Sequence, residues 1–154
     1  MKSQVVPTRS LIRIRGSASI QEAAQLMCDM SMGALGVDDV EHEFLGLVTE
    51  RDLMWAAALG KDPIETPVKE IVNDFPIVVD GPITGEVAAR RMRSGHIRHL
   101  IVRETEDLRI VSMRDLLPDC LDGLDSTTPG HMASASEMGK MFGVALAGGK
   151  NYLI

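Results

Sequence analysis

Cysteine, aromatic residues, excess positive charge and long hydrophobic runs are scarce or absent in this sequence of 154 residues. The two cysteines, Cys28 and Cys120, lie far apart without metal-binding spacing, so we expect free thiols in a reducing compartment. The net charge of −6 argues against a surface that coats nucleic acid, which needs clustered positive charge. No apolar run is long enough for a membrane-spanning helix and no signal peptide is recognisable, so we predict a cytoplasmic protein without a membrane partner.

The residues that are abundant favour a folded domain with an aliphatic core. Hydrophobic residues make up 45% of the chain although aromatic residues make up only 3%, and methionine occurs 10 times. Methionine fills irregular spaces in a core because its side chain is unbranched and flexible. A chain of this length suits one compact domain, or two small repeats that share a core.

The strongest signal is a hydroxyl, an arginine and a carboxylate placed where an apolar strand is predicted to run into a helix. This combination occurs twice, and we call the two stretches the first junction (residues 46–53) and the second junction (residues 110–117). The first junction carries Thr49, Arg51 and Asp52, and the second junction carries Ser112, Arg114 and Asp115.

The two junctions belong to a longer internal repeat, because the stretch that begins at Ser19 aligns with the stretch that begins at Thr84. Each half reads as strand, helix, strand, strand, helix, and neither half is large enough to bury its sheet alone. We therefore predict an α/β fold of two tandem βαββα repeats, packed through their sheets with pseudo-two-fold symmetry. The predicted boundaries are residues 5–60 for the first repeat, 61–75 for a linker, 76–121 for the second repeat and 122–154 for a tail that is possibly vector-derived.

Local signals predict where several helices begin and end. Ser19 begins a capping box, Ser-x-x-Glu, and Thr84 begins the corresponding helix of the second half, which Gly95 is predicted to end. A closing helix is predicted over residues 112–120. Residues 1–10 are polar and contain a proline, so we expect them to lie on the surface.

The order, duplication and spacing of these motifs resemble a tandem pair of cystathionine β-synthase (CBS) domains, called a Bateman module. Residues 97–100 and the linker residues 67–71 contribute to the resemblance. It implies a regulatory module that binds an adenosine-containing ligand, such as AMP, ADP, ATP, NAD or S-adenosylmethionine, in a cleft between the repeats. It also implies a homodimer. Nothing in the chain looks like an output domain, so a regulated protein is expected to be a separate molecule.

Two departures from the family pattern argue against two equivalent sites. Arg109 stands in the second half where the first half has Gly46. Arg98 and His99 stand where the first half has residues 33–34, a glycine and an alanine.

The junction residues allow two interpretations. In the first, each hydroxyl and each acid only cap the following helix, as in a capping box. In the second, the carboxylate accepts hydrogen bonds from a ribose diol while the helix start and an arginine attract a phosphate. The resemblance implies the second, with Asp52 and Asp115 on ribose hydroxyls and Thr49 and Ser112 on ribose or phosphate.

The basic residues near the junctions are candidates for a phosphate. Arg98 suits this role, and a neutral His99 still donates one bond. Alternatively, Arg98 is a solvated arginine and His99 is a structural histidine. Arg51 and Arg114 either contact the ligand or pair with neighbouring acids on the helix surface. The only tryptophan, Trp55, is expected in the core or in an interface.

The sequence shows no set of nucleophile, base and orienting group, and no metal-ligand cluster. We therefore expect neither catalysis nor a resident cofactor or metal. The competing hypothesis is a dimerisation or interaction scaffold that binds no nucleotide, with the methionine-rich helices as its contact surface.

Overall fold

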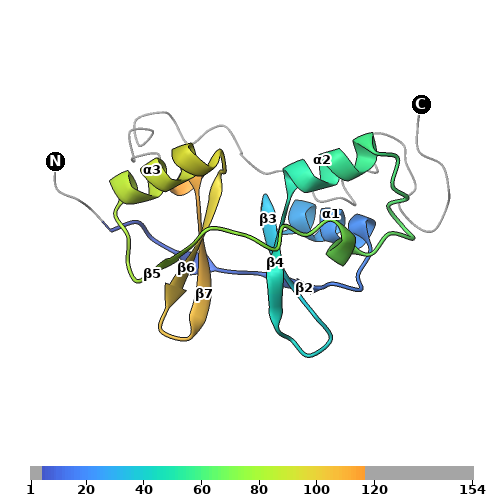
Figure 1. The fold of residues 1–154 in the computed structure, drawn as a ribbon, viewed down its shortest axis with the longest axis horizontal. Helices are drawn as coiled ribbons and strands as arrows, with labels where there is room; N and C mark the ends of the chain where they lie inside the picture. The colour runs from blue at the N-terminus through green and yellow to red at the C-terminus, as the bar shows by residue number, and fades with distance from the viewer. Residues whose placement is uncertain (1–4, 117–154) are drawn as a thin grey trace. The chain divides into compact units, whose positions relative to one another are not determined.

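The computed structural model describes residues 5–116, whose helices and strands are shown in Figure 1. Within these residues the chain forms two compact units. The first-repeat unit runs from Ile14 to Val72, and the second-repeat unit combines the N-terminal arm, up to Arg13, with the chain from Asn73 onward. The predicted boundaries do not coincide with these units, because the arm joins the second repeat and most of the predicted linker joins the first. The predicted tail, residues 122–154, lies outside the described residues.

The first-repeat unit contains one sheet with the strand order β2-β3-β4. Strands β3 and β4 are antiparallel, and Ala34 lies opposite Thr49 in their register. Helix α1 connects β2 to β3, and α2 follows directly on β4. The elements are β2 (Arg13–Arg15), α1 (Ile20–Asp29), β3 (Ala34–Asp38), β4 (Phe44–Thr49), α2 (Glu50–Ala58) and the 3₁₀ helix η1 (Val68–Glu70).

The capping box predicted at Ser19 is confirmed. The N–H of Glu22 donates to the Ser19 hydroxyl at 3.1 Å, and the Glu22 carboxylate accepts the Ser19 N–H at 2.7 Å. The stretch before η1 folds back onto this unit, because the N–H of Val68 donates to the carbonyl of Ala18 at 2.7 Å. Val68 is fully buried, so this part of the predicted linker contributes to the core of the first-repeat unit.

The second-repeat unit contains one sheet with the strand order β1-β7-β6-β5. Strands β5 and β6 are parallel and are joined by α3, whereas β1, β7 and β6 pair antiparallel. The predicted closing helix begins as a 3₁₀ helix, η2, and its later residues lie outside the described part. The elements are β1 (Arg9–Ser10), β5 (Val78–Asp80), α3 (Gly85–Gly95), β6 (His99–Glu104), β7 (Asp107–Ser112) and η2 (Met113–Leu116).

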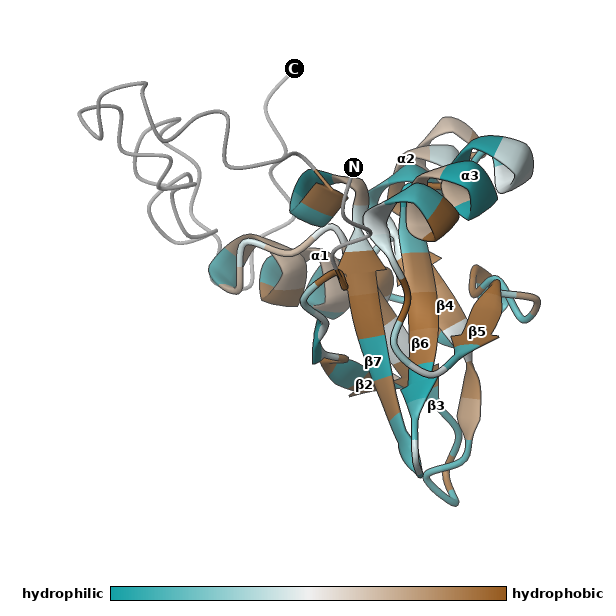
Figure 2. Ribbon diagram, turned by 90° about the vertical axis from the view of Figure 1, so that its left-hand side faces the viewer, coloured by the Kyte–Doolittle hydropathy of each residue, from teal (hydrophilic) through white to brown (hydrophobic). Residues whose placement is uncertain are grey.

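The core of the second-repeat unit includes a residue of the N-terminal arm. The side chain of Val6 is buried, and its N–H donates to the carbonyl of Ile83 at 2.9 Å. The prediction that residues 1–10 lie on the surface is therefore wrong for Val6. Figure 2 shows mainly hydrophobic residues along β6 and β7, which carry much of this core. Its buried residues are Val6, Ile83, Ala88, Met92, Leu100, Val102 and Val111.

Both units have the mixed α/β architecture that the repeat predicts. Each has a strand, a helix and two antiparallel strands in that order, and a helix or 3₁₀ helix follows the last strand. The packing of the two sheets against each other stays a prediction.

Candidate functional site

The first junction places a half-buried carboxylate against the end of a strand. Strand β4 ends at Thr49, and Oδ2 of Asp52, in the first turn of α2, accepts the Thr49 backbone N–H at 2.7 Å. The Thr49 hydroxyl donates to the same oxygen at 2.6 Å. The next N–H, that of Glu50, donates to the carbonyl of Gly33 at 3.1 Å, so the junction is also tied to the start of β3.

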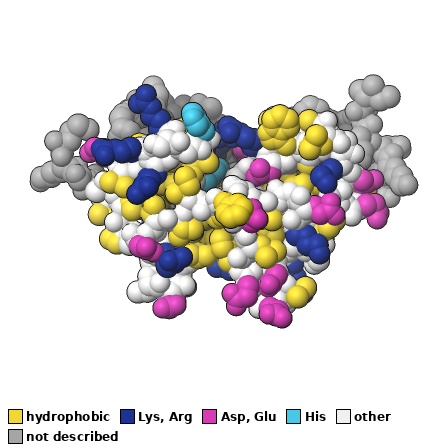
Figure 3. Space-filling model, in the orientation of Figure 1, with side chains coloured by type: hydrophobic (Ala, Val, Ile, Leu, Met, Phe, Trp, Pro, Cys, Tyr) yellow, Lys and Arg dark blue, Asp and Glu magenta, His cyan; other side chains and the backbone are white. Residues whose placement is uncertain are grey.

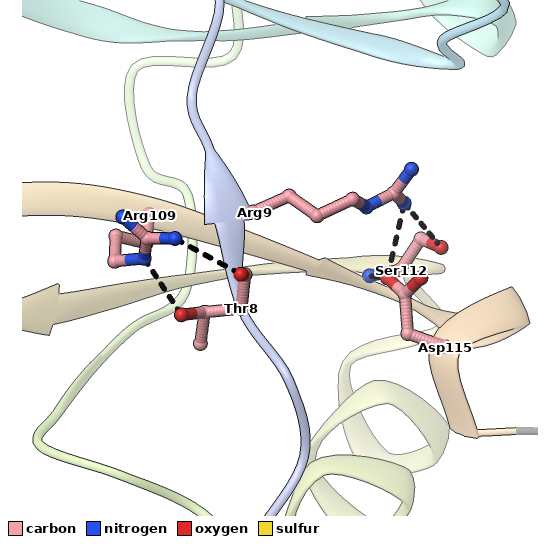
Figure 4. A network of polar contacts seen from close by, with 5 residues as sticks. All are labelled: Thr8, Arg9, Arg109, Ser112 and Asp115. Carbon is pink, nitrogen blue, oxygen red and sulfur yellow. Dashed lines mark hydrogen bonds and ion pairs between the residues drawn. The ribbon is translucent and has the colours of Figure 1, made fainter.

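The second junction repeats this arrangement and adds a partner. Oδ2 of Asp115 accepts the backbone N–H of Ser112 at 2.7 Å. One guanidinium nitrogen of Arg9, Nη2, donates to the same carboxylate oxygen at 3.0 Å and to the Ser112 hydroxyl at 3.1 Å (Figure 4). The N–H of Met113 donates to the carbonyl of Arg98 at 2.8 Å, which matches the bond from Glu50 to Gly33.

Capping and ligand binding are compatible at both junctions. The carboxylate of each aspartate accepts the N–H of the hydroxyl residue three positions earlier, as the capping interpretation predicts. Within residues 5–116, the hydrogen bonds of Asp52 and Asp115 are all accepted by Oδ2. A carboxylate has about four acceptor positions, so Oδ1 can still accept a hydrogen bond from a ligand.

Three of the four basic candidates lie at the second junction, and Arg51 lies at the first. His99 lies opposite Ser112 in the register of β6 and β7, as Ala34 lies opposite Thr49. Arg98, directly before His99, and Arg114, in η2, both have exposed side chains. The structure therefore brings together Arg98, His99, Ser112, Arg114 and Asp115 in the second-repeat unit, and Thr49, exposed Arg51 and Asp52 in the first-repeat unit.

Sequence reasoning missed Arg9, because nothing local indicates that β1 pairs with β7. The repeat pattern did single out Arg109, and the structure shows what it contacts. Its Nε donates to the Thr8 hydroxyl at 2.7 Å and its Nη2 donates to the Thr8 carbonyl at 3.0 Å (Figure 4). Glu104 accepts the Thr8 hydroxyl at 2.9 Å and pairs with Arg109 at 3.4 Å. The arginine that replaces Gly46 thus holds the N-terminal arm beside the second junction.

Helix α2 carries an exposed apolar face. Trp55 is 58% exposed, so the prediction of a core position for it is wrong and an interface position stays open. Met54 is 62% exposed and Leu59, which follows the last residue of α2, is 71% exposed, and Figure 3 shows hydrophobic side chains at the surface over α2. Large apolar side chains that gather at a surface mark interaction sites more often than single scattered ones do.

The described residues contain neither a candidate metal site nor a helix that could span a membrane. No three histidine, cysteine or acidic side chains between residues 5 and 116 come together as a possible metal site. Within the same range, no helix has the length and apolar character needed to cross a bilayer.

Comparison with known proteins identifies the family. The model of the CBS domain matches residues 3–58. An uncharacterised 17.7 kDa protein of Acidianus ambivalens is 32% identical over 123 residues, which cover 78% of this chain and 73% of that protein. The chain therefore belongs to the CBS-domain family, and its repeats follow one another as a tandem pair.

Two solved structures support this assignment. A CBS domain protein from Pyrobaculum aerophilum, complexed with AMP, is 28% identical with a TM-score of 0.63, over 71% of this chain and 85% of that one. A hexameric CBS-CP12 protein from bloom-forming cyanobacteria is 31% identical with a TM-score of 0.64, over 75% of this chain and 69% of that one.

Proposed function

We propose that this protein is a regulatory module that binds an adenosine-containing ligand and signals its level to a separate protein. One observation carries the proposal. Each repeat has a carboxylate fixed through Oδ2 to the N–H of a hydroxyl residue, at the point where the last strand of its sheet ends. A carboxylate held in this way binds a ribose diol with little loss of side-chain entropy, because its rotamer is already restricted.

The chemistry of the remaining candidates fits the rest of a nucleotide. In this proposal Asp52 and Asp115 accept ribose hydroxyls through Oδ1, and Thr49 and Ser112 lie beside them. Arginine suits phosphate because its guanidinium is planar and always charged. The AMP complex of the related Pyrobaculum aerophilum protein supports an adenine nucleotide as the ligand. The phosphate candidates are Arg51, Arg98, His99 and Arg114.

Isothermal titration calorimetry of the full chain with AMP, ADP, ATP, NAD and S-adenosylmethionine tests the proposal. We expect at least one of these ligands to bind. Asp52→Ala and Asp115→Ala should each weaken binding at their own site by roughly tenfold or more, because a hydrogen bond to a charged group is worth about 1.5–3 kcal/mol. If AMP and ATP compete for one site, the module can report the energy state of the cell.

Asp80→Ala is the matched control for these variants. Asp80 is also a paired carboxylate at the end of a strand, but it is 81% exposed and contacts Arg103 rather than a junction residue. Its removal should leave ligand affinity unchanged. Absence of binding by all five ligands, or equal affinity in the wild type and the double variant of Asp52 and Asp115, would rule out the proposal.

A dimerisation scaffold is the second candidate, and the exposed face of α2 favours it. In this proposal Met54, Trp55 and Leu59 contact a second copy of the chain. The hexameric assembly of the related cyanobacterial protein shows that a relative associates. Sedimentation equilibrium should give a dimer for the wild type and a monomer for Trp55→Glu. The control is Val40→Ser, which changes an apolar residue that is 87% exposed outside α2. A monomeric wild type contradicts this candidate and leaves nucleotide binding untouched.

A further inference from the structure

The two junctions differ in charge. Among residues 5–116, the side chains that we assign to the second junction are three arginines, Arg9, Arg98 and Arg114, and one acid, Asp115. The corresponding residues of the first junction are Glu50, Arg51 and Asp52, with the neutral residues 33–34 across the strand pair. A net positive junction attracts an anionic ligand more strongly than a net negative one does, because charge interactions act over several ångströms.

The position of Arg9 follows from the strand register. Arg9 lies opposite Ile110 in the pairing of β1 with β7. Ser112 is two residues further along β7 and therefore projects from the same face of the sheet as Ile110. A diagonal neighbour on the adjacent strand is about 7–8 Å away, a distance that a long side chain spans. The Arg9 guanidinium accordingly reaches Ser112 and Asp115 (Figure 4).

The arm that carries Arg9 is fixed on both sides of it. Before Arg9, Thr8 is held by Arg109 and Glu104, and Val6 is buried in the core of the second-repeat unit. After Arg9, the side chain of Leu11 is buried. The backbone of Arg9 is therefore held in place, and only its long side chain has to be ordered when a ligand binds.

Arg9 keeps donors for a further partner. Both of its contacts among the described residues use Nη2, whereas a guanidinium has five N–H donors in a rigid fork. Its side chain is 51% exposed, so a ligand can approach it from solvent. Asp115 likewise has Oδ1 for a ribose hydroxyl. We propose that Arg9 is a ligand-binding residue, which contacts a phosphate oxygen next to the ribose held by Asp115 and so selects a phosphorylated nucleoside over the same nucleoside without phosphate.

This inference rests on the proposed nucleotide binding and can be tested separately from it. Calorimetry with AMP and adenosine gives the ratio of the two dissociation constants for each protein. We expect Arg9→Gln to weaken AMP binding by about tenfold or more while adenosine binding changes little, because only AMP presents a phosphate. Arg9→Lys should give an intermediate loss, since lysine keeps the charge but not the fork.

Arg103→Gln is the matched control. Arg103 is 54% exposed and pairs with Asp80 at 3.2 Å, close to the exposure and the 3.0 Å ion pair of Arg9. Its replacement should leave the ratio unchanged. Circular dichroism shows whether each variant is folded. If Arg9→Gln does not fold, the ratio of the two dissociation constants is compared between the wild type and Arg9→Lys.

Two results overturn the inference. An unchanged ratio in folded Arg9 variants means that Arg9 only anchors the arm. Tighter binding of both AMP and adenosine in Arg9→Gln means that the guanidinium blocks Asp115. If the wild type binds AMP, either result leaves the proposed function standing. If the wild type binds neither compound nor any other adenosine ligand, the proposed function fails as well.

Discussion

The two junctions share a backbone arrangement and differ in what surrounds it. In both, an aspartate accepts the N–H of a hydroxyl residue at 2.7 Å, and the following N–H bonds to the residue before the neighbouring strand. The first junction opens a helix of nine residues, α2, whereas the second opens a 3₁₀ helix of four, η2. The second junction also carries arginine side chains, Arg9, Arg98 and Arg114, that supply positive charge there.

The difference shows how a duplicated motif can diverge without losing its geometry. The bonds that define the junction are local, so they survive wherever the hydroxyl and the acid are kept. The charge around it comes from residues of other strands, such as Arg9 and Arg98, and these can change in one repeat alone. On the proposal that both junctions bind a ligand, the shared backbone arrangement and the different charges suit them to different ligands, or to one ligand with different affinities.

The largest effect on stability should come from truncating a buried leucine on the equivalent strand of each repeat. Leu35 on β3 and Leu100 on β6 are both fully buried. Leu35→Ala and Leu100→Ala should each lower the free energy of unfolding by about 2–5 kcal/mol, measured by urea denaturation. Val40→Ala, at a residue that is 87% exposed, should stay within about 0.5 kcal/mol. A large loss in only one of the two core variants would show that the repeats do not contribute equally.

Replacing the aspartate of each junction should cause a loss of stability that depends on salt at the second junction but not at the first. Asp52→Ala and Asp115→Ala should each cost about 1–3 kcal/mol of stability, because each leaves a backbone N–H without its acceptor. Among the described residues, Asp115 forms an ion pair with Arg9 and Asp52 forms none, and salt screens an exposed ion pair. Urea unfolding at low and high NaCl should therefore reduce the Asp115 loss and leave the Asp52 loss unchanged. Equal salt dependence would contradict the contact with Arg9.

The arm contact is specific to the second repeat and should cost less to break. Arg109→Ala removes the bonds to Thr8 and should lower stability by about 1 kcal/mol, since Arg109 is partly exposed. Hydrogen exchange should also be faster at the N–H of Val6, which the arm holds against Ile83. Arg103→Ala on the neighbouring strand is the control and should not change exchange at Val6.

The smallest difference is expected at the helix caps. Ser19 makes both bonds of a capping box with Glu22, whereas Thr84 makes one long bond, 3.4 Å, from the N–H of Val87. Ser19→Ala should cost about 1 kcal/mol and Thr84→Ala about 0.5 kcal/mol in thermal unfolding. A larger loss at Thr84 than at Ser19 would contradict this difference between the two caps.

Local signals in the sequence predicted most helices and strands and both junctions. They did not predict β1, a strand of two residues that forms by pairing with β7. Helix α3 ends at Gly95, as predicted, but the left-handed residue that caps it is His96, with a φ of 51°, rather than the glycine. The predicted closing helix begins as a 3₁₀ helix over Met113–Leu116, and its remaining predicted residues, 117–120, lie outside the described part.

The candidate site was predicted only in part, for a related reason. Thr49 and Asp52, like Ser112 and Asp115, are three residues apart, so a single turn of chain brings each pair together. Arg9 and Asp115 are separated by 106 residues, and only the pairing of β1 with β7 places them in contact. No periodicity or local motif encodes such a contact.

The sequence by itself determined the repeat, the α/β class and the fixed carboxylate at each junction, because these depend on residues close together along the chain. Only the tertiary structure decided that the N-terminal arm belongs to the second repeat and that Arg9 stands beside Asp115. The physical reason is that strand pairing and side-chain burial select among many distant segments, and that choice depends on the whole fold rather than on any one stretch.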